Sequence, residues 1–213
     1  FEVKDAQELI LAAALASEIE DQDAIDLAVI GGLQDRNVLK SYEQLKFVPF
    51  DPVNKRTEGT VKDAQGKIFK VTKGAPQVII GMSRVDDADK TKAEQVINDF
   101  AAKGYRTLGV ARAEEEGPWR FLGILPLYDP PREDSAETIA QAQAHGIQVK
   151  MVTGDNLAIG REIAGQLGLG NNIYAAGKLL KTGSEEGQMA TDTGEQVEQA
   201  DGFAQVFPEH KYG

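Results

Sequence analysis

One segment of the chain reads Ile147-Gln148-Val149-Lys150-Met151-Val152-Thr153-Gly154-Asp155. It begins with a mostly apolar run over residues 147–152, which is typical of a buried parallel strand. A helix is predicted from about residue 156, because apolar side chains then recur at helical spacing as far as Leu167. The order of strand, polar turn and helix predicts an α/β unit in this half of the chain.

The sequence on both sides of this unit contains further signals. Before it, Asp129-Pro130-Pro131-Arg132 interrupts regular structure, and a helix is predicted over residues 133–145. After it, residues 171–201 are polar and rich in Gly, Ser and Thr, which indicates a loop excursion. One more short strand is predicted over residues 203–207.

The first half of the chain predicts a different arrangement, an antiparallel sheet with helices packed on it. Helices are predicted over residues 5–16, 23–32 and 89–102, the last with one apolar face. Strands are predicted over residues 42–47, 60–61, 68–71, 106–112 and 119–125, with a hairpin at Asp63-Ala64-Gln65-Gly66. The whole chain is therefore predicted to combine α/β and α+β architecture.

Composition restricts the class of protein. The 213 residues carry 23 basic and 34 acidic side chains, a net charge of −11, which argues against a general nucleic-acid binder. There is no Cys, so disulfides and thiolate metal sites are excluded. The longest apolar run, residues 9–16, is too short to cross a membrane. Because the sequence lacks an initiating Met, we interpret it as a piece of a longer protein.

Basic residues gather between Arg36 and Lys73, where nine basic and four acidic residues give a local charge of +5. This patch suggests a small anionic ligand. The alternative is that lysines on strand surfaces only protect against aggregation.

Two motifs of this basic segment could bind such a ligand. Phe50 is followed by Lys55 and Arg56, so a base could stack on the ring while a cation reaches a phosphate. Lys73-Gly74-Ala75-Pro76 ends a strand and opens a helix, where Gly allows close approach of a ligand and free N–H groups favour anions. The alternatives are a core Phe beside a turn and a plain strand-to-helix connection. No P-loop motif is present.

Thr153-Gly154-Asp155 follows the predicted parallel strand, and ligands of such sheets bind beyond the carboxyl ends of strands. Its hydroxyl and carboxylate could hold Mg²⁺ or a phosphate oxygen. Alternatively, Asp155 only caps the helix that follows. His145 is expected at a helix C-terminus, and His210 has no partner in the sequence.

Five motifs in order resemble the cytoplasmic catalytic region of P-type cation-transporting ATPases, and the surrounding sequence resembles the plasma-membrane proton-ATPase subgroup. The motifs are Phe50 to Thr57, Lys73 to Pro76, Asp129 to Arg132, Met151 to Asp155, and Phe203 to Tyr212.

The resemblance implies a nucleotide-binding domain over residues 1–116, with a mixed antiparallel sheet and flanking helices. It also implies part of a haloacid-dehalogenase-like, Rossmann-like phosphorylation domain over residues 117–213. ATP is the implied ligand, with Phe50 stacking on adenine and Asp26 near the adenine amino group. The other implied contacts to the pocket and phosphates are Lys55, Lys73, Gly74 and Arg106. Near the terminal phosphate the resemblance places Asp129, Arg132, Thr153, Gly154 and Asp155.

The resemblance further implies Mg²⁺ held mostly outside this chain, and an aspartyl-phosphate enzyme at the cytoplasmic face of the plasma membrane. Its partners would be the actuator and transmembrane domains of the same polypeptide, without direct membrane contact or nucleic acid. The family's phosphoacceptor Asp-Lys-Thr-Gly-Thr and its Gly-Asp-Gly-x-Asn-Asp are absent from the sequence. The chain alone is thus expected to bind ATP without turnover. A free-standing haloacid-dehalogenase-like phosphatase and a non-catalytic nucleotide-binding module are the alternatives.

Overall fold

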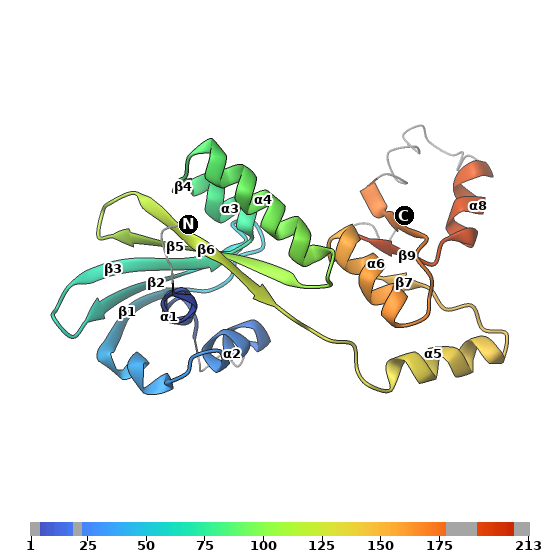
Figure 1. Cartoon of the computed structure of the whole chain (residues 1–213), viewed down its shortest axis with the longest axis horizontal. Coiled ribbons are helices and arrows are strands. Elements are labelled where there is room, and N and C mark those ends of the chain that lie inside the picture. The colour runs from blue at the N-terminus through green and yellow to red at the C-terminus, as the bar shows by residue number, and fades with distance from the viewer. Residues whose placement is uncertain (1–4, 19–22, 178–190, 207–213) are drawn as a thin grey trace. The chain divides into compact units, whose positions relative to one another are not determined.

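The computed structural model describes residues 5–18, 23–177 and 191–206, and the contacts within it divide the chain into two compact units (Figure 1). The domain boundary expected after residue 116 stays a prediction. The division by contacts assigns Phe1–Ile97 and Thr107–Leu127 to unit 1, and Asn98–Arg106 and Tyr128–Gly213 to unit 2.

Unit 1 is built on a six-stranded mixed sheet of order β1-β2-β3-β5-β6-β4. The pairs β1–β2, β2–β3 and β3–β5 are antiparallel, and β4 pairs with β6 in parallel. The predicted hairpin is confirmed, and its turn uses Gly66 at φ 83°. The strands are β1 (Tyr42–Val48), β2 (Arg56–Asp63), β3 (Ile68–Gly74), β4 (Ser83–Arg84), β5 (Arg106–Glu114) and β6 (Trp119–Leu127).

Helices cover both faces of this sheet, as Figure 1 shows. Neighbouring residues of one strand serve opposite faces: Val110 belongs to the core under the first helices, and Ala111 to the core under the later ones. The predicted mixed sheet with flanking helices is thus confirmed. The first face carries α1 (Ala6–Leu15) and α2 (Ala24–Gly31), the second α3 (Pro76–Met82) and α4 (Asp87–Ala101), and a 3-10 helix η1 (Arg36–Ser41) precedes β1.

Unit 2 contains a three-stranded parallel sheet of order β7-β9-β8. Its apolar core includes Ala164, Leu169, Ile173 and Ala204. His145 ends one of its helices, as expected, and its Nδ1 lies 2.8 Å from the carbonyl oxygen of Gln141. The elements are α5 (Ser135–Ala144), β7 (Met151–Val152), α6 (Leu157–Gln166), β8 (Ile173–Ala175), α8 (Thr191–Gln199) and β9 (Gly202–Ala204).

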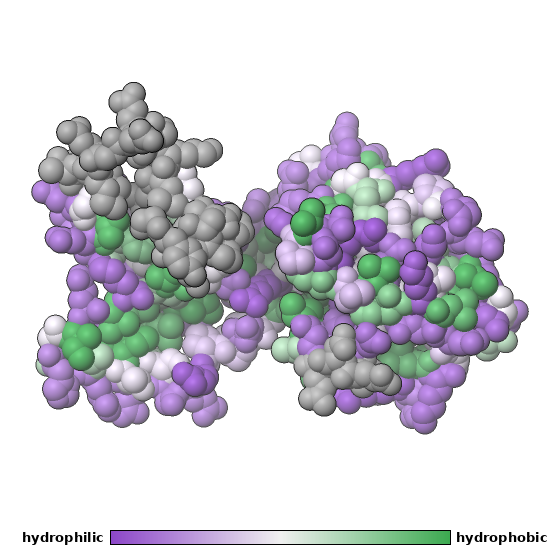
Figure 2. All heavy atoms as spheres, turned by 180° about the vertical axis from the view of Figure 1, so that it is seen from behind, coloured by the Kyte–Doolittle hydropathy of each residue, from purple (hydrophilic) through white to green (hydrophobic). Residues whose placement is uncertain are grey.

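Three expectations about unit 2 need correction. The strand predicted over residues 147–152 is only Met151–Val152, and it is not buried: Ile147 and Val152 are 58% and 56% exposed. Within the described residues β7 lies at the edge of its sheet with β9 as its neighbour, so one side of the strand is uncovered. Figure 2 accordingly shows hydrophobic residues at the surface of unit 2.

The other two corrections concern the end of the chain. The loop expected over residues 171–201 contains β8 and α8. The strand expected over residues 203–207 ends at Ala204, because Gln205 turns the chain with φ 56°. Residues 207–213, which include His210, lie outside the described part.

None of the helices in the described ranges combines the length and hydropathy that crossing a bilayer requires.

Candidate functional site

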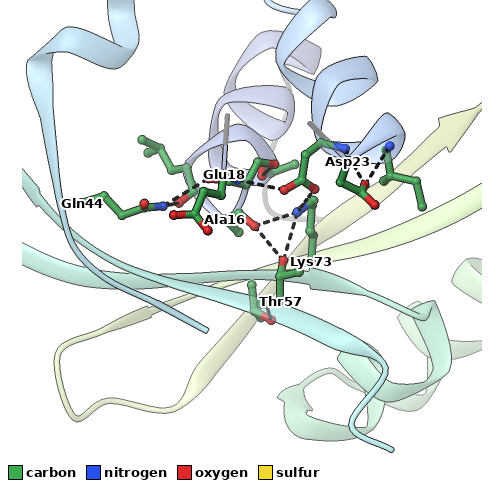
Figure 3. A network of polar contacts seen from close by, with 12 residues as sticks. Ala16, Glu18, Asp23, Gln44, Thr57 and Lys73 are labelled. Atoms are coloured by element: carbon green, nitrogen blue, oxygen red, sulfur yellow. Dashed lines mark hydrogen bonds and ion pairs between the residues drawn. The ribbon is translucent and has the colours of Figure 1, made fainter. Parts of the chain in front are cut away.

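The ammonium of Lys73, near the end of β3, lies in a buried polar network of unit 1 (Figure 3). Its Nζ donates to the carbonyl of Ala16 at 2.7 Å and to Oγ1 of Thr57 at 3.0 Å, and pairs with Oδ1 of Asp26 at 2.8 Å. An ammonium has three N–H donors, so these acceptors match all of them. A ligand that bonds to Lys73 must therefore replace one of these partners.

Burial controls the charge of this lysine. Lys73 is 2% exposed, and desolvation lowers its pKa, while the hydrogen bond and the charge of Asp26 raise it. Asp23 adds a weaker charge effect in the same direction as Asp26. The pair with Asp26 is what makes a cation tolerable at this depth.

Asp26 is positioned by the start of α2. The side chain of Asp23 caps this helix by accepting the N–H groups of Ile25 and Asp26, at 2.9 and 3.1 Å. Asp26 is 6% exposed, and its second oxygen accepts the N–H of Glu18 at 2.8 Å. Two of the predicted site residues, Asp26 and Lys73, are thus in direct contact.

Two further residues of this network were missed by the sequence analysis. Thr57 donates its hydroxyl to the carbonyl of Ala16 at 2.6 Å. Gln44 of β1 donates from Nε2 to the carbonyls of Leu15 and Ser17, at 3.4 and 3.2 Å. The period-2 pattern of β2 could have found Thr57, because it places this hydroxyl on the core face.

Phe50 and Lys55 lie on the exposed turn between β1 and β2. Phe50 is 61% exposed, so the alternative of a core Phe is wrong and its ring is available to a ligand. Asp51 organises the turn, since its Oδ1 accepts the N–H groups of Val53 and Asn54 at 2.9 and 2.6 Å. Lys55 has φ 52°.

A backbone bond joins this turn to the end of β3. The N–H of Ala75 donates to the carbonyl of Lys55 at 2.9 Å. At Gly74 a Cβ would collide with the backbone of Lys55 and Arg56, so the glycine serves close packing of the chain with itself. Pro76 begins α3 as expected, but this helix has only seven residues. Lys73-Gly74-Ala75-Pro76 is therefore a strand-to-helix connection that holds the Phe50 turn in place.

In unit 2, Arg106 and Asp155 form a two-pronged ion pair. Nε lies 2.9 Å from Oδ1, and Nη2 donates to Oδ2 at 3.0 Å. The hydrogen bond to Asp155 raises the pKa of Arg106, with the charges of Asp155 and Asp129 acting in the same direction. Asp129, 73% exposed, lies 3.6 Å from Nη1. Three predicted residues thus gather here.

The turn at Thr153 orients this carboxylate. The hydroxyl of Thr153 donates to Oδ2 of Asp155 at 3.1 Å and accepts the N–H of Asp155 at 3.1 Å. Asn156 caps α6 by accepting the N–H of Ala158 at 2.8 Å. The alternative that Asp155 only caps the helix is therefore wrong.

Two predicted residues, Gly154 and Arg132, and a pocket beside Arg106 remain to be described in unit 2. Gly154 and Arg132 are exposed, and Arg132 lies outside the ion pair. A pocket of about 280 Å³ is lined by Arg106, Asp129 and Asp155 together with Pro130 and Pro131 among others. It offers a cation and two carboxylates to a polar ligand.

The donor set does not fit a complete Mg²⁺ site. In the described ranges no three or more His, Asp or Glu side chains gather as metal ligands. Asp129 and Asp155 both face Arg106, whose charge opposes a second cation there.

The profile of the haloacid dehalogenase-like hydrolases matches residues 37–186, more than half of the chain. The chain belongs to this family. Haloacid dehalogenase-like hydrolases generally use Mg²⁺, so the described residues supply at most part of that site.

This haloacid dehalogenase-like chain is also 46% identical over 212 residues to a protein of Methanocaldococcus jannaschii named "Putative cation-transporting ATPase MJ1226". The alignment covers 97% of the chain and 26% of the relative, so the chain spans about a quarter of that protein's length.

Proposed function

We propose that the chain is the ATP-binding part of the catalytic region of an ATP-driven cation pump, one that exports protons and forms an aspartyl-phosphate. The exposed ring of Phe50 carries the proposal. It lies on a turn whose backbone is bonded, through Lys55 and Ala75, to the segment that carries Lys73. The name of the similar protein of Methanocaldococcus jannaschii supports the coarser part of the proposal, a cation-transporting ATPase.

In this proposal adenine stacks on Phe50, and its amino group donates to Asp26. Such stacking contributes about 1–3 kcal/mol. Lys55 is exposed on the same turn and reaches the phosphates as a mobile charge. Lys73 holds the charge of Asp26 in place, and Gly74 keeps the two segments close.

The terminal phosphate is assigned to the loop of Thr153, Gly154 and Asp155, with Asp129, Arg132 and Arg106 as the charged groups around it. Phosphoryl transfer depends mainly on positioning and on neutralising charge. Arg106 supplies the cation, and Asp155 keeps it oriented until a phosphate replaces the carboxylate. The attacking aspartate and most Mg²⁺ ligands belong to segments of the pump outside this sequence, next to its actuator and transmembrane domains. The pump would lie in the plasma membrane with this chain on its cytoplasmic face.

The test is a titration of the 213-residue chain with ATP, followed by the backbone amide signals of Phe50, Lys73 and Arg106. We expect saturable shifts with a dissociation constant of about 0.1–1 mM, and no release of phosphate. Val53→Ala is the matched control for Phe50→Ala, because Val53 lies on the same turn and is 85% exposed. Absence of saturation at several millimolar ATP would contradict the proposal.

The family match favours one rival function, a free-standing haloacid dehalogenase-like phosphatase. Such an enzyme needs a nucleophilic aspartate at the end of a strand. In the described part of unit 2, Asp155 follows strand β7 by three residues, and Arg106 and Thr153 engage it. Turnover of a simple phosphomonoester by the chain, abolished in Asp155→Asn, would establish the phosphatase. Saturable ATP binding without turnover would reject it.

A further inference from the structure

The Lys73 network contains a buried residue to which the proposed function assigns no contact with ATP. Thr57 is 7% exposed, and its hydroxyl bridges two elements: it donates to the carbonyl of Ala16 after α1 and accepts from Nζ of Lys73 on β3. Figure 3 shows Thr57 and the carbonyl of Ala16 next to the ammonium of Lys73, with dashed lines joining the three groups.

We propose that Thr57 is a positioning residue that fixes the ammonium of Lys73 against Asp26 and so sets the geometry of the nucleotide site. That the site binds a nucleotide rests on the proposed function. The positioning of Lys73 by Thr57 is a property of the chain without ligand.

The direction of each hydrogen bond supports this role. The Thr57 hydroxyl has one proton, which the Ala16 carbonyl takes at 2.6 Å, so its oxygen is left as an acceptor for Lys73. The Ala16 carbonyl accepts from both side chains. The oxygen of Thr57 therefore faces Lys73 as an acceptor. It is one of the three acceptors around the ammonium, together with the Ala16 carbonyl and Asp26.

Gln44 gives this arrangement a second support. It bonds to the carbonyls of Leu15 and Ser17, which flank Ala16 in the chain. The turn after α1 is thus held to edge strand β1 on both sides of the carbonyl that Lys73 uses. Gln44 is itself exposed, so changing it leaves the core intact.

The decisive variant is Thr57→Val, which keeps the branched shape but removes the acceptor. The charged form of Lys73 then loses one hydrogen bond, which lowers the pKa of Lys73 further. Asp26 and Asp23, the carboxylates whose charges act on Lys73, are unchanged. We expect the pH profile of Lys73 acylation, followed by peptide mass spectrometry without nucleotide, to move down by about one unit, a tenfold change in neutral amine.

Two variants serve as controls. Thr57→Ser retains the hydroxyl and should restore the profile of the original chain. Thr60→Val lies on the opposite face of the same strand and should leave the profile unchanged. A purely structural role for Thr57 would lower thermal stability without moving the acylation profile, and that result would overturn the proposal.

A second route covers the case in which Thr57→Val does not fold. Gln44→Met keeps the length of the side chain but removes its hydrogen bonds to the carbonyls of Leu15 and Ser17. We expect the acylation profile of Lys73 to shift in the same direction, by a smaller amount. An unchanged profile in Gln44→Met, with Thr57→Val unfolded, would overturn the proposal.

ATP titration of the same variants separates the two levels of inference. Weaker ATP binding in Thr57→Val, restored in Thr57→Ser, supports both the positioning role and the proposed function. A shifted acylation profile in a chain that never binds ATP supports the positioning role and rejects the nucleotide. ATP binding with an unmoved profile rejects the positioning role alone.

Discussion

The ammonium of Lys73 lies 2.8 Å from Oδ1 of Asp26, and both side chains are almost completely buried. A buried ion pair adds little net stability over an apolar pair, but removal of one partner leaves an uncompensated charge. The pair is thus expected to be a point of strong sensitivity in unit 1.

Lys73→Met tests this sensitivity. We expect a loss of about 3–5 kcal/mol in the free energy of unfolding of unit 1, since Asp26 is left charged and buried. Chemical denaturation measures it. Lys70→Met, on the opposite face of β3, should change stability by no more than about 0.5 kcal/mol. Equal effects of the two changes would contradict the importance of the pair.

Phe50→Ala separates binding from folding. Because the ring is 61% exposed, its removal should leave the thermal unfolding temperature unchanged. Loss of stacking should weaken ATP binding about tenfold, as measured by calorimetry or by amide shifts. A Phe50→Ala chain that binds ATP like the original would place the adenine elsewhere.

Gly74→Ala tests the close contact between two segments of the site. A Cβ here would meet the backbone of Lys55 and Arg56, which cannot move aside like a side-chain tip. We expect a loss of about 2 kcal/mol or more in stability. The control is Gly81→Ala in α3, where the space is open and a gain of up to about 1 kcal/mol is expected. If Gly74→Ala is neutral, the contact does not constrain this position.

Glu114 should contribute an acid-sensitive part of the stability. A hydrogen bond from Lys67 is the main cause that lowers the pKa of Glu114 below its ordinary value of 4.5, with the nearby charge of Arg112 acting likewise. The folded state thus binds a proton less readily than the unfolded state. The contribution is complete above pH 4.5 and is lost as the pH falls through the lowered pKa.

Urea unfolding between pH 3 and pH 6 checks this dependence. In Glu114→Gln, the free energy of unfolding should decrease less steeply below pH 4.5. Glu116 is an exposed neighbour of Glu114, and Glu116→Gln should leave this decrease unchanged. An identical decrease in both variants would show that other carboxylates control the acid limb.

The sequence predicted unit 1 well because its local signals agree with its contacts. Asp23 caps α2, Gly66 turns the hairpin and Pro76 begins α3, each for a reason that lies within a few neighbouring residues. Unit 2 was less predictable. The apolar run 147–152 carries the composition of a strand, but a strand forms only where a partner strand pairs with it, and that partner is remote in sequence.

In the candidate site too, local signals were predictable and contacts between residues remote in sequence were not. Motifs indicated Phe50, Lys55 and Lys73, but no pattern along the chain shows that Lys73 bonds to the carbonyl of Ala16, which is 57 residues away. A backbone acceptor carries no side-chain signature. The contacts among Arg106, Asp129 and Asp155 likewise depend on the fold, although each residue was selected beforehand.

The capping of α6 by Asn156 has a consequence for how the neighbouring acid can be used. Since the first turn of that helix is secured by the adjacent amide side chain, Asp155 can release Arg106 and take a new partner without fraying the helix. In the proposed function, a phosphate can therefore displace the carboxylate of Asp155 from Arg106 while Asn156 keeps the start of α6 in place.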